Sequence, residues 1–438
     1  MRQKIMIVFA ILLLAVLFTS CGIRPIRPIE ELMRPPVFSQ EDSALHGALQ
    51  EAVNLRLEGD EKRKVSIVYK QPKKGEYNTA VVKRDLNADG RMEAIAFYVP
   101  RSALLNMQTN VQIAFLSAEE DGEWTCLQDE QGNGTDVEFV RFCDFDGNGT
   151  QEILVGWRVT QNSVDTKFTL YDLDYSRENT PLKSLVTRDY QTVDVLDADA
   201  DGIDEIFFSM SDSMGTPERN FAAALDYAPN TPTGIQERPH VALDTRVFRY
   251  IGSYVNKLND GRTVVLLDGQ YGANQMLTEV VSWNAASNGF TAAFSDPKTR
   301  VNSKTCRDIL LPAQDFDGDG LTDIPTQYAM LGSKTPVQLI RWNAVAQDLT
   351  LQKIQDDLLY FHPSHSICVQ DFFGRSVTAD RADDENIVTL LVYAWDADTK
   401  RRGEQLLTLT WDSAATIDAL TYTLTPYAEK NGYKPNIA

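Results

Sequence analysis

The chain has 438 residues, of which 43% are hydrophobic and 24% charged, and its formal net charge is −20 at pH 7. That length is sufficient for one large domain with its own core. The acidic balance, with no basic patch to oppose it, argues against a nucleic-acid partner.

The N-terminus has the organisation of a secretory signal. MRQK carries two positive charges, IMIVFAILLLAVLF is apolar, and FTSCG closes the stretch on small residues beside Cys21. This pattern predicts a signal peptide over residues 1–20 rather than a retained span. The closing residues resemble a bacterial lipobox, so we expect lipid on Cys21 and an extracytoplasmic protein anchored to the bacterial cell membrane. The alternative is an ordinary signal peptide or short anchor with a coincidental cysteine.

A spacer and a helix are expected next. Residues 21–38 contain four prolines and no hydrophobic period, which predicts a stiff tether. SQEDSALHGALQEAVNLRL then places Leu45, Leu49 and Val53 at helical spacing after an acidic start. We assign residues 39–77 to this N-terminal helix and a leading strand, and residues 78–438 to the body of the protein.

Four copies of one acidic loop are the most informative feature of the body. They read DLNADGRMEAI from Asp85, DFDGNGTQEIL from Asp144, DADADGIDEIF from Asp197 and DFDGDGLTDIP from Asp315. Each has carboxylates or carboxamides at positions 1, 3 and 5, Gly at 6 and an acid at 9. Alternate side chains converge in a tight turn, and Gly permits the bend, so the spacing suits calcium. Similar patterns occur in solvated turns, but four copies in register favour a metal site.

These loops differ from EF-hands. The last acid stands at position 9 rather than 12, and an apolar run such as IAFY or ILVGW follows where an EF-hand begins a helix. The sequence therefore predicts a calcium site between two strands.

The intervals between the loops predict the architecture. The first residues of successive copies are 59, 53 and 118 residues apart, and the last interval is twice 59. A degenerate copy, NKLNDGRTVVLL, indeed starts at Asn256 and keeps the turn at Asp260 and Gly261. It has Leu258 at position 3 and Val264 at position 9, so we expect it to hold no metal. A sixth, more degraded copy is expected near Asp371, with an insertion before a strand over residues 387–393.

Repeats of this length, rich in short strands, predict an all-β fold: a β-propeller of six or seven blades, with a short N-terminal helix. Aromatic residues recur near the turns, as in VVSWNAASNGF and LIRWNAVAQDL. Their matched positions favour packing between blades over stacking on carbohydrate. We number the loops 1 (85–93), 2 (144–152), 3 (197–205), 4 (the degenerate copy, 256–264) and 5 (315–323).

The loops resemble those of FG-GAP/VCBS-type propeller repeats, as in integrin α-subunit heads, over about residues 78–424. That resemblance implies about four Ca²⁺ sites in loops between blade strands, with position 7 ligating through its carbonyl. The Phe-Gly and Gly-Ala-Pro signatures are missing, and three loops end in Glu rather than Asp. The N-terminal part also resembles lipoproteins of Gram-positive gut anaerobes. The implied ligands are Asp85, Asn87, Asp89, Arg91 and Glu93; Asp144, Asp146, Asn148, Thr150 and Glu152; Asp197, Asp199, Asp201, Ile203 and Glu205; and Asp315, Asp317, Asp319, Leu321 and Asp323.

Cysteines and histidines predict little. Besides Cys21 there are four cysteines, which allow three disulfide pairings or free thiols: Cys126, Cys143, Cys306 and Cys368. His362 and His365 could ligate a metal, but a loop pair separated by Pro is more often structural.

No nucleophile, zinc or phosphate-loop motif is present. Calcium would hold the loop carboxylates ionised, the opposite of a general acid. We therefore expect a non-enzymatic module for binding, adhesion or scaffolding, with a protein or glycan ligand. The alternative is a cell-envelope enzyme, for example one acting on glycans, built on the same propeller.

Overall fold

The computed structural model describes residues 40–56, 65–101, 110–119, 122–160, 165–177, 180–211, 220–335, 337–359, 366–368, 376–384, 387–412 and 421–424. Four predicted features lie outside these residues: the signal peptide, the tether with Cys21, the pair His362 and His365, and the start of the sixth copy at Asp371. Within them, no helix has the length and apolarity that a membrane span requires.

The N-terminal helix lies where the sequence predicts it. Helix α3 spans Gln40–Arg56, and Leu45, Leu49 and Val53 are buried against the first sheet. Near its end, the Arg56 guanidinium lies 2.9 Å from the Asp129 carboxylate. An apolar stripe at helical spacing therefore docks this helix on a sheet, as its pattern indicates.

Within the described residues, the body consists of six antiparallel sheets of four or five strands, so the all-β prediction is confirmed. Sheet 1 contains β1 (Ser66–Tyr69), β2 (Val81–Arg84), β3 (Glu93–Arg101), β4 (Gln112–Ala118) and β5 (Trp124–Gln131), and sheet 2 contains β6 (Asp136–Cys143), β7 (Glu152–Arg158), β8 (Thr166–Leu173) and β9 (Leu182–Tyr190). Sheet 3 contains β10 (Thr192–Leu196), β11 (Glu205–Met210), β12 (Phe221–Tyr227), β13 (Ile235–Glu237) and β14 (Val241–Ala242), and sheet 4 contains β15 (Arg249–Lys257), β16 (Thr263–Gly272), β17 (Gln275–Asn284) and β18 (Gly289–Ala292). Sheet 5 contains β19 (Ile324–Ala329), β20 (Gln338–Val345), β21 (Leu351–Leu359) and β22 (Ser366–Cys368), and sheet 6 contains β23 (Val377–Asp384), β24 (Ile387–Asp396), β25 (Arg401–Asp412) and β26 (Thr421–Leu424).

Each sheet is essentially a meander in which successive strands pair. The exceptions are β1 and β2, which both pair with β3, and β13 and β14, which both pair with β12. Short connections suffice for such antiparallel neighbours, which agrees with the frequent Asn, Asp and Gly in the turns.

The hydrophobic core lies between consecutive sheets rather than inside any one of them. Sheets 1 and 2 share one apolar cluster, sheets 2 and 3 a second, sheets 3 and 4 a third, and sheets 4 and 5 a fourth. Edge-to-face ring pairs cross the first three interfaces, namely Phe97 with Trp157, Phe168 with Phe208, and Phe207 with Phe290. Sheets 1 to 5 therefore stack face to face in chain order.

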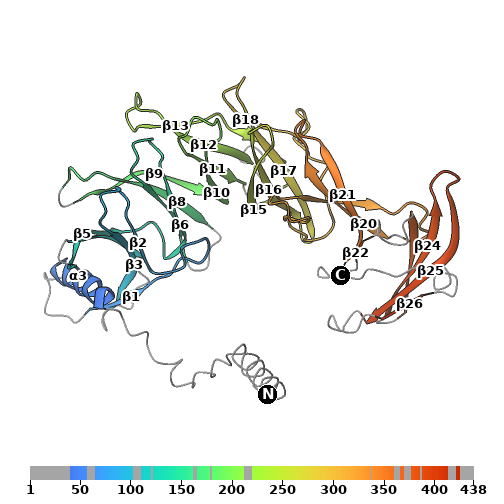
Figure 1. The fold of residues 1–438 in the computed structure, drawn as a ribbon, viewed down its shortest axis with the longest axis horizontal. Helices are drawn as coiled ribbons and strands as arrows, with labels where there is room; N and C mark the ends of the chain where they lie inside the picture. The colour runs from blue at the N-terminus through green and yellow to red at the C-terminus, as the bar shows by residue number, and fades with distance from the viewer. Residues whose placement is uncertain are drawn as a thin grey trace, which may run out of the picture.

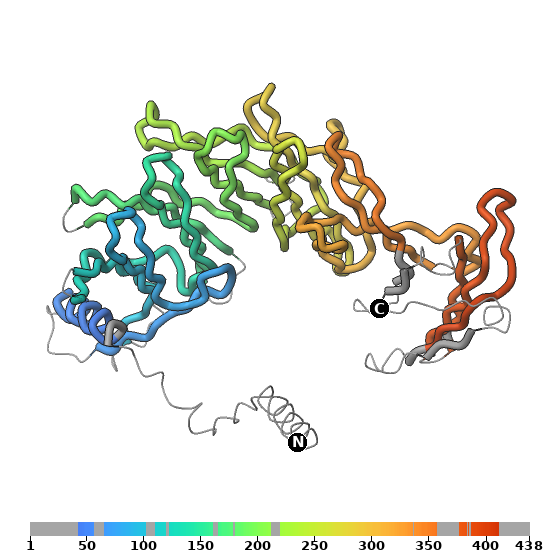
Figure 2. The backbone as a smooth tube through the Cα atoms, in the orientation of Figure 1, coloured from blue at the N-terminus to red at the C-terminus, as the bar shows by residue number. Residues whose placement is uncertain are grey.

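The sheets follow one another along an arc in chain order (Figure 1). The first and last sheets lie at opposite ends of this arc (Figure 2). Among the described residues, no strand pairing or shared apolar cluster joins sheet 1 to sheet 6. The arrangement is propeller-like in its stacked four-stranded sheets, and the predicted number of blades stays a prediction.

The prediction for the sixth copy is wrong in one respect. The segment expected to be an insertion before residue 387 contains strand β23, which pairs with β24 from Val377 opposite Ala394 to Asp384 opposite Ile387. The strand expected over residues 387–393 is present as part of β24. Alternation in VTADRADD is weak, so its strand character is hard to recognise from sequence.

Candidate metal centres

Each acidic loop leads directly into a strand: β3 after loop 1, β7 after loop 2, β11 after loop 3 and β19 after loop 5. Loops 1, 2 and 3 join β2 to β3, β6 to β7, and β10 to β11, respectively. In front of β19, an isolated antiparallel bridge between Gln314 and Asp323 takes the place of the first strand at loop 5. The predicted position of these loops between two extended segments is confirmed.

The backbone of each intact loop contains two left-handed residues. At position 6, Gly90, Gly149, Gly202 and Gly320 have φ between 85° and 89°. At position 4, Ala88, Gly147, Ala200 and Gly318 have φ between 57° and 79°. Only Gly adopts this region without a steric cost, which explains the invariant Gly at position 6 of all four copies. Loop 4 keeps the turn at Gly261, with φ of 83°, but not a left-handed position 4.

Backbone N–H groups hold the acidic side chains in a repeated pattern. The position-1 carboxylate accepts from the Gly at position 6, the position-5 side chain from the N–H of position 7, and the position-9 carboxylate from the N–H of position 2. In loop 2 these bonds are Gly149 N–H to Asp144 at 3.2 Å, Thr150 N–H to Asn148 at 2.6 Å, and Phe145 N–H to Glu152 at 2.6 Å. The same three bonds recur in the other intact loops. The loops are therefore pre-organised by their own backbone.

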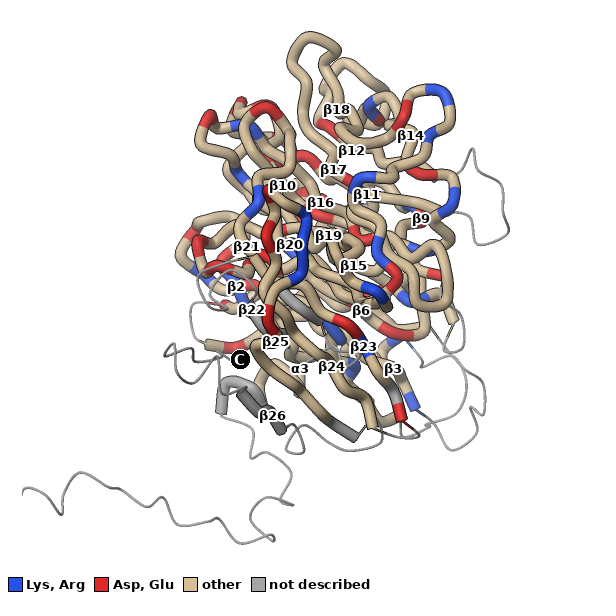
Figure 3. The backbone as a smooth tube through the Cα atoms, turned by 90° about the vertical axis from the view of Figure 1, so that its right-hand side faces the viewer, with Lys and Arg blue, Asp and Glu red and all other residues tan. Residues whose placement is uncertain are grey.

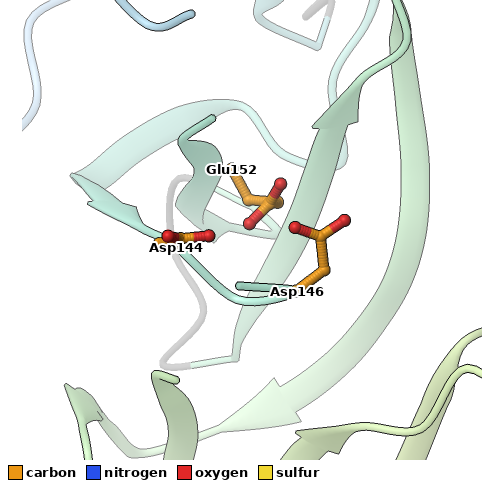
Figure 4. Close-up of side chains that lie close together, drawn as sticks. All are labelled: Asp144, Asp146 and Glu152. Carbon is orange, nitrogen blue, oxygen red and sulfur yellow. The ribbon is translucent and has the colours of Figure 1, made fainter. Parts of the chain in front are cut away.

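Three loops bring three carboxylates together. In each of them, oxygens from positions 1, 3 and 9 lie within 4.8 Å of one another, and Figure 4 shows the loop-2 side chains turned toward a common point. The groups are Asp144, Asp146 and Glu152; Asp197, Asp199 and Glu205; and Asp315, Asp317 and Asp323.

Unpartnered oxygens indicate what these groups lack. Glu152 and Glu205 are 1% exposed, and each has one buried carboxylate oxygen without a hydrogen-bond partner. In loop 3, one oxygen each of Asp197 and Asp199 is also buried and unpartnered. Buried polar atoms are nearly always satisfied, so such atoms call for a missing partner. An all-oxygen donor set of this kind fits a hard cation such as Ca²⁺.

Electrostatics agree with this fit. Burial, reinforced by repulsion from neighbouring loop acids, raises the pKa of Glu152 and of Glu205 to about 8, and that of Asp323 to about 6. Without a cation, holding these groups ionised together costs free energy. A divalent cation at the point of convergence would remove that cost and restore the ionised forms.

Loop 1 has the same frame with a different donor set, because its position 3 is Asn87 rather than an acid. Among the described residues, Asp85, Asp89 and Glu93 therefore do not form a group of three carboxylates like those of loops 2, 3 and 5. Glu93 is 1% exposed, and one oxygen of Asp85 is buried without a hydrogen-bond partner. A guanidinium nitrogen of Arg91 lies 3.5 Å from Asp89, and the pKa of Asp89 is lowered, chiefly by the hydrogen bond from the Arg91 backbone N–H. A fourth calcium site at loop 1 stays a prediction.

Loop 4 takes this substitution further. Arg262, again at position 7, lies 2.7 Å from the Asp260 carboxylate, and Leu258 at position 3 is buried in the apolar cluster between sheets 4 and 5. In loop 4, the charge of Arg262 therefore takes the place of a metal ion, and the apolar Leu258 takes the place of a position-3 ligand. This supports the prediction of a metal-free fourth loop.

Neighbouring loops are also hydrogen-bonded to one another, which the sequence analysis missed. Position 8 of each loop contacts position 1 or 2 of the loop before it. Between loops 2 and 1, the Gln151 N–H donates to Leu86 O (3.0 Å); between loops 3 and 2, the Asp204 N–H donates to Asp144 O (3.3 Å) and the Asp144 N–H to Asp204 Oδ2 (3.2 Å). Between loops 4 and 3, the Thr263 hydroxyl donates to Asp197 O (3.2 Å). Between loops 5 and 4, the side-chain amide of Asn256 donates to Thr322 O and accepts the Thr322 N–H (2.9 Å each). We call this series of contacts the loop belt. The polar Asn256, kept at position 1 of a loop without other ligands, is the sequence feature that could have indicated these contacts.

Other predicted residues have structural roles. Cys126, Cys143 and Cys306 are free thiols, and the side chain of Cys368 is not among those that the structure describes. Trp342 stacks on Phe316 with ring centroids 4.6 Å apart, and Trp342 and Trp283 are both buried. These two aromatic residues pack within the body, as their matched positions predict.

Comparisons with known proteins leave the family open. No protein-family model matches the chain, and neither does any curated protein. Solved structures with weak similarity include an endo-1,4-β-xylanase from Bacteroides thetaiotaomicron, at 8% identity and a TM-score of 0.25, covering 66% of this chain and 97% of that chain. An endo-1,5-α-L-arabinanase from Thermotoga petrophila gives 9% identity and a TM-score of 0.27, covering 82% of this chain and 98% of that chain. An α-L-arabinofuranosidase from Clostridium thermocellum gives 10% and 0.24, covering 65% and 90%. Scores this low carry no argument about function.

Replacing Glu152 by Gln should remove one calcium site. Gln keeps an oxygen for the Phe145 N–H but loses the charge that binds the cation. Extracellular calcium modules have dissociation constants of about 10⁻⁴–10⁻³ M, so at ~1 mM calcium each site adds roughly 0.4–1.4 kcal/mol. Denaturation with and without a chelator should show that the variant has lost this increment. Asp260→Asn in loop 4 is the matched control and should leave calcium stoichiometry unchanged; an equal loss from both variants would contradict the assignment.

Replacing Asp204 by Ala should weaken calcium binding at loop 2, although Asp204 belongs to loop 3. The substitution removes the carboxylate that holds the Asp144 N–H, a bond worth about 0.5–1.5 kcal/mol, or roughly two- to tenfold in affinity. Calorimetric titration in a Glu205→Gln background, where loop 3 is silenced, isolates the effect. Gln151→Ala keeps its backbone bond to loop 1 and serves as the control. Unchanged affinity in the Asp204 variant would show that the belt does not couple the sites.

Proposed function

We propose that this chain is a calcium-stabilised, propeller-like binding module presented at the outer face of a bacterial membrane. The observation that carries the proposal is the convergence of three carboxylates in each of loops 2, 3 and 5. Calcium at these loops would fix the entry to β7, β11 and β19. The metal then serves the fold, and the surfaces between the loops are left for a ligand.

The other buried carboxylates favour binding over catalysis. A general acid needs an accessible carboxyl group with a raised pKa. Four of the buried or half-buried carboxylates instead form ion pairs with arginine: Asp194 with Arg141 at 3.3 Å, Glu138 with Arg158 at 2.6 Å, Asp268 with Arg307 at 3.0 Å, and Asp356 with Arg341 at 2.6 Å. A guanidinium engages each of these carboxylates, so the pairs support a structural role.

Glu279 is a further buried carboxyl group. Burial raises its pKa to about 7, but the side chain is fully enclosed and accepts hydrogen bonds from the Asp244 N–H at 2.6 Å and the Ser295 hydroxyl at 3.1 Å. A substrate could not reach it without opening the sheet. This environment supports packing rather than proton transfer.

The finer features of the proposal come from the sequence. FG-GAP/VCBS-like repeats would close the stacked sheets into a propeller of six or seven blades, with loop 1 as a weaker fourth calcium site. The ligand would be a protein or a glycan. Figure 3 shows Lys and Arg interspersed with Asp and Glu rather than gathered on one face, which agrees with a partner other than nucleic acid.

The alternative is a cell-envelope enzyme acting on glycans. One observation favours it: the carboxylates of Asp199 and Asp260 both line a pocket of about 580 Å³. Paired carboxylates in a pocket are the general requirement of glycoside hydrolysis. Against it, Asp199 belongs to a metal loop and Asp260 is paired with Arg262.

One experiment separates the two functions. The protein is incubated with insoluble bacterial cell-wall glycan in ~1 mM calcium, and co-sedimentation and newly formed reducing ends are both measured. We expect the protein to sediment with the glycan without releasing reducing ends. Release of reducing ends that Asp260→Asn abolishes would establish the enzyme instead, and a failure to sediment would remove glycan as the ligand.

The membrane anchor has its own test. Lipid on Cys21 would make the protein partition with membranes, and Cys21→Ser should block lipidation and leave the precursor unprocessed. Mass spectrometry of the mature N-terminus measures both. A mature chain that begins downstream of Cys21 without lipid would show a freely secreted protein.

A further inference from the structure

A pocket of about 580 Å³ lies where loop 3, loop 4 and the turn between β17 and β18 meet. Its wall includes Asp199 from loop 3, Arg262 from loop 4, and Trp283, Asn284 and Thr291 around the turn. The volume falls within the range of about 300–1,000 Å³ typical of small-molecule sites. The pocket thus adjoins loop 3, a predicted metal loop, and loop 4, the degenerate copy.

A second copy of the same sequence motif shows why the pocket is open. Trp-Asn-Ala occurs at residues 283–285 and again at 342–344. Trp342 is covered by Phe316, which stands at position 2 of loop 5 and stacks on it at an interplanar angle of 11°. Loop 4 has Lys257 at that position. Trp283 therefore receives no stacked ring from its own loop; it packs edge-to-face against Phe290 at 5.2 Å, is 8% exposed and borders the pocket.

The two asparagines differ in the same way. Asn343 is 2% exposed, and its amide nitrogen donates to three oxygens, those of Ile324, Thr326 and Arg341. Asn284 is only partly buried, and its carbonyl oxygen accepts the Ala286 N–H at 3.0 Å. Within the described part of the chain, its amide N–H₂ has no recorded partner. The motif that is structural in sheet 5 thus presents a donor to the pocket in sheet 4.

The wall chemistry selects the ligand class. Arg262 neutralises Asp260 at 2.7 Å, and a cation in loop 3 would engage Asp199, so the wall carries little net charge for an ion to bind. Asn284, Thr291 and Arg262 offer hydrogen bonds, while Trp283 and Leu349 offer apolar surface. Hydroxyl groups on a carbon skeleton match this combination of polar and apolar wall.

We propose that this pocket binds a neutral, hydroxyl-rich ligand the size of one or two sugar residues. The inference rests on the proposed function and supplies its ligand class and its site. Because Asp199 belongs both to the loop-3 carboxylate group and to the pocket wall, calcium in loop 3 fixes one side of the pocket. Ligand and calcium therefore strengthen each other's binding, and this coupling is reciprocal.

The test uses saturation-transfer NMR and calorimetry on the full chain, with xylose, arabinose, galactose, N-acetylglucosamine, xylobiose and chitobiose as probes. Asn284→Asp keeps the oxygen that accepts the Ala286 N–H but removes the donor, and Ala286→Trp fills the pocket from an exposed turn position. Ser287→Ala lies in the same turn outside the pocket wall and is the control.

At least one probe should bind in ~1 mM calcium. Affinity should fall about tenfold in Asn284→Asp, as expected for a lost hydrogen bond to a buried ligand, and should be lost in Ala286→Trp. It should also fall on chelation, and Ser287→Ala should match the unmodified chain. Equal melting temperatures would show that the variants fold.

Two results would overturn the inference. Binding that persists in Ala286→Trp and Asn284→Asp would place the sugar site elsewhere and leave the binding-module proposal standing. Binding of none of the six probes by a folded, calcium-loaded protein would overturn the ligand class. The proposed function itself is judged separately, by co-sedimentation with cell-wall glycan.

Discussion

Repulsion among carboxylates that the backbone forces together is the constraint on which this structure depends. In loops 2, 3 and 5, N–H groups orient three acidic side chains until their oxygens lie within 4.8 Å, and burial of the position-9 acid prevents water from screening them. Such a loop needs a counter-charge. The chain supplies this counter-charge in two ways. Loops 2, 3 and 5 present oxygen atoms that a divalent cation could bind, whereas loops 1 and 4 place an arginine at position 7 beside the acid of position 5.

The loops matter beyond their own turns because they are joined. Sheets 1 to 5 stack face to face through apolar clusters, and the loop belt connects them along one edge. Each sheet contacts mainly its neighbours, as in other repeat architectures where stability is the sum of unit and interface terms. A counter-charge in one loop therefore supports the interface to the next.

Much of the local structure could be predicted from the sequence. The spacing of Asp, Gly and a final acid located the loops, and the stripe of Leu45, Leu49 and Val53 located the helix, because both depend on short-range geometry. Loop 1 differs from its relatives at position 3, where Asn87 is visible in the sequence, whereas the approach of Arg91 to Asp89 depends on side-chain placement that a motif does not record. The pocket was missed because it depends on Trp283 lacking the stacked ring that Phe316 supplies to Trp342. Whether the stacked sheets close into a ring depends on long-range packing, which repeat length does not determine.

Loop 4 gives the series of sheets an unequal chemistry. Toward sheet 5, Asn256 holds the backbone of Thr322, which is position 8 of metal loop 5, through two side-chain hydrogen bonds at 2.9 Å. On its N-terminal side, Thr263 holds the carbonyl of Asp197, which is the first residue of a metal loop. Loop 4 is therefore a metal-free turn that is hydrogen-bonded to a metal loop on each side, by two bonds toward sheet 5 and by one toward sheet 3. When calcium falls, loops 3 and 5 would both lose their ion while loop 4 keeps Arg262 as its counter-charge, so the turn of sheet 4 would stay ordered between two loosened neighbours.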